Sequence, residues 1–187
     1  MAVKTFTTGE VLTASDTNTY LANAGLVYIT STTFTGSTTV DILNCFSATY
    51  DDYRVHVNIY GSAATYAKGQ FLDSTTPSAT GYYKAGFTLL YNSAALTAYT
   101  AANETAIIPI AQYGTTAANS SMSVMDIFGP ALARNTNYQI NIQDPNAIER
   151  YDINGTHAST TTYEGLRVFG NSGTISGTIT VYGYRKA

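Results

Sequence analysis

Few residues of this sequence could carry acid–base chemistry, and no motif groups them. His56 and His157 are the only histidines. His56 falls on the polar side of an alternating segment, and His157 follows an Asn-Gly pair in a Ser/Thr-rich stretch, so we expect both imidazoles to be exposed to solvent. A Ser-His-Asp triad needs three side chains that meet in space, and nothing in the sequence indicates one.

Two sets of carboxylates have spacings that could hold a proton or a metal ion. Asp51 and Asp52 are adjacent, but neighbouring residues of a strand face opposite sides, so we interpret the pair as a turn that opens the next strand. The run Asp152-Ile153-Asn154-Gly155 is similar to the middle of a calcium loop without its first ligand and its distal Glu. A loop calcium site with Asp144 and Asp152 remains a minor alternative, and the main expectation is a protein without metal or cofactor.

Motifs for nucleotide binding and for nucleophilic catalysis are absent from the sequence. There is no phosphate-binding loop or GxGxxG motif, and residues 170–173 (GNSG) lack the spacing of a GxSxG nucleophile elbow. Cys45 is the single cysteine, and its neighbours Leu43 and Phe46 predict a small buried residue rather than a reactive thiol. We therefore expect no enzymatic activity, and an esterase or glycosidase is a third hypothesis that no motif supports.

Tyrosine is the side chain with the clearest potential for binding. The chain has 16 tyrosines and no tryptophan. A tyrosine offers a large apolar ring with one polar tip, which suits subunit interfaces and sugar rings alike, although it is also a common strand residue. The tyrosines expected to face outward, as interface or glycan contacts, are Tyr60, Tyr182 and Tyr184.

The composition excludes several classes of partner. Charged residues make up 11% of the chain, against about 25% in average soluble proteins. The formal net charge is −3 and no segment gathers several cations, so direct binding to nucleic acid or to an anionic membrane surface is not expected. A charge-poor, hydroxyl-rich surface suits lasting contact with other proteins. There is no 18-residue apolar run and no apolar signal segment, which predicts synthesis in the cytoplasm without membrane insertion.

One helix is predicted, near the start of the chain. Residues 13–16 (TASD) have a capping-box pattern, and Gly25 can end the helix in a left-handed turn. A helix of about three turns is marginal alone in water, so it must pack on something. Residues 1–25, with this short helix, are therefore either a lid on the following domain or a docking arm for another subunit, and we favour the docking arm. Its expected contact residues are Phe6, Val11, Leu12, Tyr20 and Leu21.

From residue 26 onward the hydrophobic period changes to two, which predicts strands. Asn154-Gly155 is the strongest turn signal among them, typical of a type I′ hairpin. About ten short strands with frequent turns and no internal repeat predict an all-β domain over 26–187. We favour an antiparallel, jelly-roll-like β-sandwich, with an immunoglobulin-type sandwich as the alternative. The predicted strands are 26–34, 38–43, 53–60, 66–73, 82–91, 105–112, 121–128, 137–143, 148–153, 160–169 and 175–184.

Three segments resemble proteins of tailed-phage particles. Residues 3–16 (VKTFTTGEVLTASD) and 18–21 (NTYL) resemble the arm at the start of many such virion proteins. Residues 50–55 (YDDYRV) and 175–185 (ISGTITVYGYR) resemble an early and the last strand of jelly-roll domains on virion appendages. These matches cover about a fifth of the chain.

The resemblance implies a non-enzymatic structural protein on the surface of a virion, as a tail fibre, an adaptor or a capsid decoration protein. Its partners would then be other phage virion proteins and further copies of itself, with a trimer favoured, and it could take part in host attachment. In this hypothesis the arm docks on the particle and the β-domain self-associates. The alternative function is a carbohydrate-binding module that recognises a host surface glycan through tyrosines.

Overall fold

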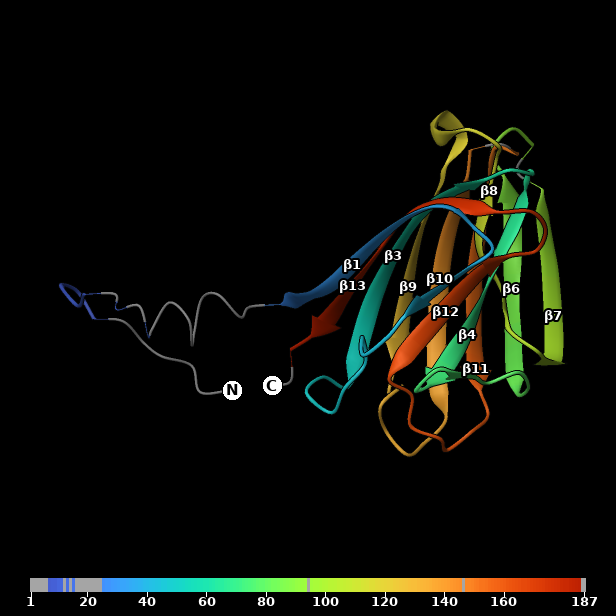
Figure 1. The fold of residues 1–187 in the computed structure, drawn as a ribbon. Helices are drawn as coiled ribbons and strands as arrows, with labels where there is room; N and C mark the ends of the chain where they lie inside the picture. The colour runs from blue at the N-terminus through green and yellow to red at the C-terminus, as the bar shows by residue number, and fades with distance from the viewer. Residues whose placement is uncertain are drawn as a thin grey trace.

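The chain from residue 25 onward forms two antiparallel β-sheets that face each other, as a computed structural model shows (Figure 1). The structure describes residues 7–11, 13, 15, 25–93, 95–145 and 147–185. This architecture confirms the prediction of an all-β, antiparallel, sandwich-like domain. The helix predicted within residues 13–25 lies almost entirely outside the described residues.

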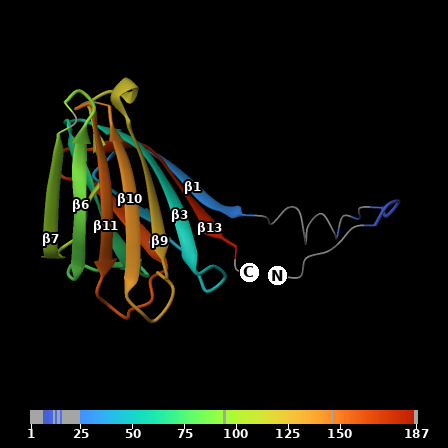
Figure 2. The same ribbon diagram turned by 180° about the vertical axis from the view of Figure 1, so that it is seen from behind.

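The larger sheet has eight strands, and Figure 2 shows it in front. Every neighbouring pair in it is antiparallel. From one edge to the other, the strands are β1 (Leu26–Ser37), β13 (Ile175–Tyr184), β3 (Asp52–Gly61), β9 (Ser121–Phe128), β10 (Thr136–Asp144), β11 (Glu149–His157), β6 (Tyr82–Leu90) and β7 (Leu96–Glu104).

The smaller sheet has five strands and covers only the middle of the larger one. Its order is β2 (Thr39–Ile42), β12 (Gly165–Gly170), β4 (Thr65–Asp73) and β5 (Thr76–Pro77), and β8 (Ile107–Tyr113) also pairs with β4. A single short 3-10 turn, η2 (Ala117–Asn119), interrupts the β-structure of the described residues. The strands at the two edges of the larger sheet, β1 and β7, contain no buried residue.

The core lies between the two sheets and is built by alternation. In β3 the side chains of Val55, Val57 and Ile59 are at most 1% exposed, whereas those between them face solvent or are half-buried. Phe71 of β4 and Leu166 of β12 meet them from the smaller sheet and are fully buried. Burying one such side chain contributes roughly 1.5–3 kcal/mol, which is why the period-two pattern decides the strand's orientation.

Cys45 is part of this core, as predicted. Its side chain is 1% exposed, and the thiol donates a hydrogen bond to the carbonyl oxygen of Ile42 at 3.3 Å. Burial raises the pKa of Cys45 to about 12, so the thiolate needed for reactivity does not form near neutral pH.

The predicted hairpin turn at Asn154-Gly155 is wrong. Both residues lie inside β11, where Gly155 pairs with Tyr138 of β10. A Cβ atom on Gly155 would lie 2.2 Å from the Tyr138 ring, so the glycine makes room for an aromatic side chain instead of making a turn. The Asn-Gly dipeptide looks the same in the local sequence whether it forms a hairpin turn or lies inside a strand.

Two other local predictions also need correction. Residues 35–37, which the predicted strands 26–34 and 38–43 leave as a connection, belong to β1, where an irregularity in the register lets Gly36 adopt a φ of +61° and donate its backbone N–H to Ser176 Oγ. Strand β7 was not predicted, because its sequence LTAYTAANE is dominated by small residues rather than by alternating large apolar ones.

Candidate interaction surfaces

The first candidate surface is the pair β1 and β13, which we call the terminal ribbon. Its 22 residues include no Asp, Glu, Lys or Arg. On its outer face, Tyr28 is 60% exposed and packs edge-on against Tyr182, with ring centroids 6.1 Å apart. Beyond this pair, hydroxyl groups link the strands at 3.0 Å (Ser31 to Thr180) and 3.1 Å (Thr33 to Thr178). The outer face of the ribbon is therefore uncharged, with hydroxyl groups linked across the strands, and it is exposed along β1 and half-buried along β13.

The ribbon also has an open edge. Among the described residues, β13 is the only strand that pairs with β1, so the other side of β1 presents backbone groups without a strand partner. Natural edge strands are commonly protected by charged side chains, prolines or bulges. The sequence of β1 has no charge and no proline, and its two register irregularities lie between Tyr28 and Thr30 and between Phe34 and Ser37. The segment between them is a regular strand that can accept another.

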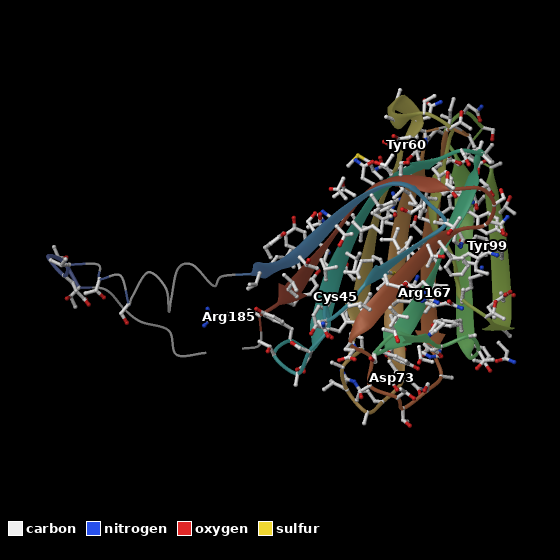
Figure 3. The ribbon with its side chains drawn as sticks, in the orientation of Figure 1. Cys45, Tyr60, Asp73, Tyr99, Arg167 and Arg185 are labelled. Carbon is white, nitrogen blue, oxygen red and sulfur yellow. The ribbon has the colours of Figure 1, made fainter. Side chains whose placement is uncertain are left out.

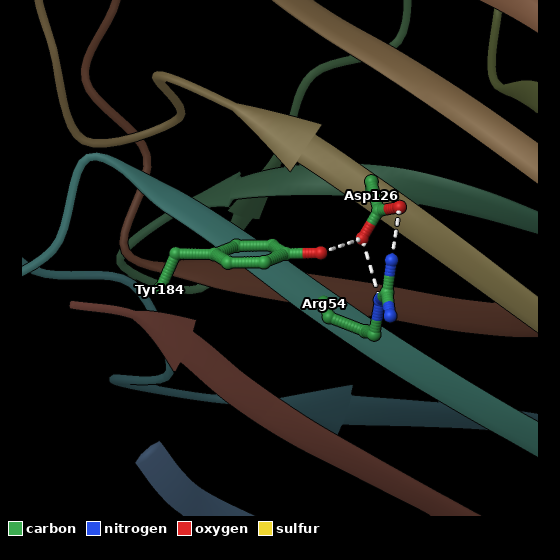
Figure 4. Close-up of polar contacts among 3 residues, drawn as sticks. All are labelled: Arg54, Asp126 and Tyr184. Atoms are coloured by element: carbon green, nitrogen blue, oxygen red, sulfur yellow. Dashed lines mark hydrogen bonds and ion pairs between the residues drawn. The ribbon is translucent and has the colours of Figure 1, made fainter. Parts of the chain in front are cut away.

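The second candidate surface is the outer face of the larger sheet. Its central polar cluster consists of Arg54, Asp126 and Tyr184 (Figure 4). Arg54 donates two hydrogen bonds of 2.8 Å to the two carboxylate oxygens of Asp126, and the Tyr184 hydroxyl donates a third of 2.8 Å. Register explains the geometry, because Arg54 of β3 lies directly opposite Asp126 of β9.

The charged groups of this cluster are paired with one another. Burial alone would raise the pKa of Asp126, but the hydrogen bonds from Arg54 and Tyr184 outweigh it and lower that pKa below its usual value. Burial and the bond to Asp126 raise the pKa of Tyr184 to about 12. The carboxylate therefore stays ionised and paired, and it is no proton donor at neutral pH.

Three shallow depressions follow one another along the outer face, starting at this cluster, and we call them together the outer groove. They measure about 240, 260 and 230 Å³. The first two share Val124 and Asn141, and the first and third share Asn58. Their other outward-facing lining residues are His56, Met122 and Gln143 in the first, Arg54, Asp126, Gln139 and Asp152 in the second, and Tyr60, Ala117, Ser120 and Thr178 in the third.

The three tyrosines predicted to face outward do lie on this outer face and are half-buried, but the structure does not bring them together. Tyr60 lines the third depression, near the opposite end of the sandwich from Asp73 (Figure 3). Tyr182 lies opposite Arg54 and contacts Tyr28 and His56, while Tyr184 belongs to the Arg54 cluster. Tyr60 pairs instead with Ser176, so it sits far along β3 from the other two.

Of the predicted arm contacts, only one can be placed. Val11 is 79% exposed. Phe6, Leu12, Tyr20 and Leu21 lie outside the described residues.

The structure confirms the predicted exposure of His56 but not that of His157. His56 is exposed on β3, as expected. His157 is only 2% exposed, and its ring stacks on Tyr82 at 4.2 Å. The residues that bury it, Tyr82 and Tyr163, come from other segments of the chain, so the local sequence could not reveal its burial.

The hydrogen bonds of His157 define its protonation. Nδ1 lies 3.2 Å from the Gly81 carbonyl oxygen, which can only accept, so Nδ1 carries the proton. Nε2 then accepts from the hydroxyl of Tyr163 at 2.7 Å, and the Ser78 hydroxyl lies 3.0 Å from the same nitrogen. Burial lowers the pKa of His157. Because a backbone carbonyl, not a carboxylate, orients the ring, this cluster is not a Ser-His-Asp triad.

The carboxylates considered for metal binding are separated. Asp144 is buried at the end of β10, whereas Asp152 faces outward on β11 and pairs with Arg150 at 3.0 Å. Asp52 is the first residue of β3 and Asp51 lies in the bend before it, as predicted. Within the described part of the chain, no three His, Cys, Asp or Glu residues lie close enough together to hold a metal ion, and no helix is both long and apolar enough to cross a membrane.

Of the residues that line the outer groove, the sequence analysis proposed Tyr60 as a contact but missed the amides, although one signal for them was present. Strand β10 alternates amides with apolar residues in the run NYQINIQ. This alternation was used to predict the strand, but not to recognise a stripe of amides on its outer face.

Comparison of the chain with protein-family models and with curated proteins finds no match. The proposals below therefore depend on the two surfaces and on the sequence resemblance.

Proposed function

We propose that the protein is a non-enzymatic structural component on the surface of a tailed-phage virion, a tail fibre, an adaptor or a capsid decoration protein, and that it self-associates through the terminal ribbon. One observation carries the self-association. The ribbon offers two strands of 12 and 10 residues without a charged side chain, of which β1 has exposed residues and an open edge, while the outward residues of β13 are half-buried. Association there desolvates no ionised group, which removes the main cost of burying a surface.

The virion assignment is supported by the resemblance of residues 3–21, 50–55 and 175–185 to phage appendage proteins. In this proposal residues 1–25 form the docking arm, with its short helix, and the β-domain is a variant of the jelly roll. Successive strands that change sheet support the jelly-roll part, since β1, β2, β3 and β4 alternate between the two sheets. The site of action would be the virion, after synthesis in the host cytoplasm.

The test of self-association introduces like charges along the ribbon. We expect the wild-type protein to be an oligomer, with a trimer favoured, and the double variant Tyr28→Lys, Thr35→Lys to be a folded monomer by size-exclusion chromatography with light scattering. The matched control is Ala98→Lys, Thr100→Lys on β7, the other edge of the same sheet, where both positions are also exposed. A wild type that stays monomeric, or an oligomer that only the β7 variant dissociates, would show that the ribbon is not the interface.

The docking role of the arm needs a separate experiment. A chain that lacks residues 1–25 should fold, because β1 begins at Leu26, and should no longer be incorporated into particles. If the shortened chain fails to fold, the arm belongs to the core of the domain and does not dock.

Carbohydrate binding is the second candidate function, and the outer groove supports it. The groove lies on the face of the larger sheet that the smaller sheet leaves uncovered, so it would remain accessible if copies associated through the ribbon edge.

A further inference from the structure

The outer groove is lined by amide side chains with unused hydrogen-bonding capacity. Along β10, alternate residues present amides outward, and Asn58 of β3 adds another. The side chains of Gln139, Gln143 and Asn58 have no hydrogen-bond partner among the residues that the structure describes. Each amide offers two donors and one acceptor, so the groove carries both kinds of group at closely spaced positions. The outward amides of β10 are Asn137, Gln139, Asn141 and Gln143.

The ionised groups of the groove are already neutralised. Arg54 is held by Asp126 in a two-pronged pair, and Asp152 accepts from both Arg150 and Asn141. An anionic ligand would have to compete with a carboxylate for the Arg54 guanidinium, and a cation would meet the same competition at Asp152. The groove therefore favours a ligand that is polar but uncharged.

The groove also has apolar surface between its polar groups. Met122 is 64% exposed, and Val124, half-buried, lies between the first two depressions. Tyr60 supplies an aromatic side chain at the third. A sugar ring combines an apolar face of C–H groups with a rim of hydroxyls that donate and accept, and this mixture matches the alternation of amides with apolar side chains.

We propose that the outer groove binds a chain of uncharged sugar residues. The ring beside Gln139 and Asp126 would occupy the second depression, the next would lie over Val124 and Asn141, and a further ring would reach Tyr60. This inference deepens the second candidate function and rests on it, but it is independent of assembly through the terminal ribbon. It assigns the contact to the amides of β10 and β3 rather than to the tyrosines of the ribbon.

The experiment starts with the full-length protein on a glycan array that carries neutral, sialylated and sulfated oligosaccharides. The neutral oligosaccharide with the strongest signal is then titrated calorimetrically into the wild type and into Gln139→Ala, Gln143→Ala. Both glutamines are exposed, so the variant should fold normally. The control, Asn92→Ala, Asn171→Ala, removes two exposed amides from loops outside the groove.

We expect a neutral oligosaccharide to bind, the groove variant to bind it about tenfold more weakly or worse, and the control to bind normally. Binding of acidic glycans alone, or no binding, would overturn the proposal together with the carbohydrate function. Unchanged affinity in the groove variant would overturn the site while leaving that function. A groove variant that dissociates an oligomer in light scattering would instead identify the face as an interface between copies.

Discussion

Strands β3 and β1 belong to the same sheet and are separated by one strand, yet they differ in how they are stabilised. In β3, every second residue from Tyr53 to Gly61 is buried, because the smaller sheet covers that side. In β1, no residue is buried, although Ile29 and Phe34 touch the edge of the core. The alternation of residues thus predicts a strand for both β3 and β1. Whether the alternating apolar residues stabilise the fold depends on whether the smaller sheet covers them.

The strongest test of this comparison shortens the same side chain, isoleucine to alanine, in each of the two strands. Ile59→Ala in β3 should reduce the free energy of unfolding by about 3–4 kcal/mol, because the side chain is fully buried and leaves a cavity. Ile29→Ala in β1 should cost about 1 kcal/mol or less, since its side chain is only partly buried. Urea unfolding at low protein concentration measures both. Equal losses would mean that something covers the ribbon in solution.

A second test concerns close packing under the covered part of the sheet. Gly155→Ala should destabilise the fold by about 1–3 kcal/mol, because the new methyl group would overlap the Tyr138 ring. The neighbouring Asn154→Ala, on the exposed face of the same strand, should change stability by about 0.5 kcal/mol or less. Thermal melting of the two variants checks the pair, and a neutral Gly155→Ala would show that the ring can move aside.

The buried histidine extends the comparison to pH. Burial lowers the pKa of His157 below its ordinary 6.5, so the unfolded chain takes up the proton first as the pH falls. His157 therefore contributes a loss of stability that begins as the pH falls through about 6.5 and is absent above it. We expect His157→Gln to flatten the dependence between pH 7 and pH 5 in urea unfolding, and a variant that keeps the wild-type slope would contradict this assignment.

The smallest effect is expected for ion pairs on the outer face. Arg54→Ala should cost about 0.5–1 kcal/mol, since the pair with Asp126 is two-pronged and partly buried, with side-chain exposures of 33% and 19%. Arg150→Ala, at a more exposed pair, should cost less. Chemical denaturation at low and high salt compares them, and a larger loss in Arg150→Ala would contradict the ranking.

Much of the fold could be predicted because the covered strands repeat large apolar residues at every second position, as in Val55, Val57 and Ile59. Two of the errors share one cause, because the local sequence does not say which side chains from other strands pack over a residue. Gly155 has the signal of a turn and serves as space for Tyr138, while His157 lies in a polar stretch and is buried by Tyr82 and Tyr163.

The candidate surfaces could be predicted only in part, for a related reason. The outward direction of Tyr60, Tyr182 and Tyr184 follows from strand alternation. Which side chains meet across strands depends on register, and this is what places Arg54 against Asp126 and separates Tyr60 from Tyr184. The amides of β10 were readable as a stripe, but their neighbours on β3 and β9 were not.

The position of the ends of the β-domain has a mechanical consequence. β1 and β13 are antiparallel neighbours, Leu26 lies opposite Tyr184, and the N–H of Arg185 donates to the carbonyl oxygen of Gly25 at 3.2 Å. A force that pulls residues 25 and 185 apart acts along the hydrogen bonds between the strands, so it loads one rung at a time and unzips the ladder. A force that pulls both ends in the same direction, against the far end of the sandwich, leaves that ladder unloaded. If both ends were attached to the same support, the domain would thus resist a pulling force far better than if its two ends were drawn apart.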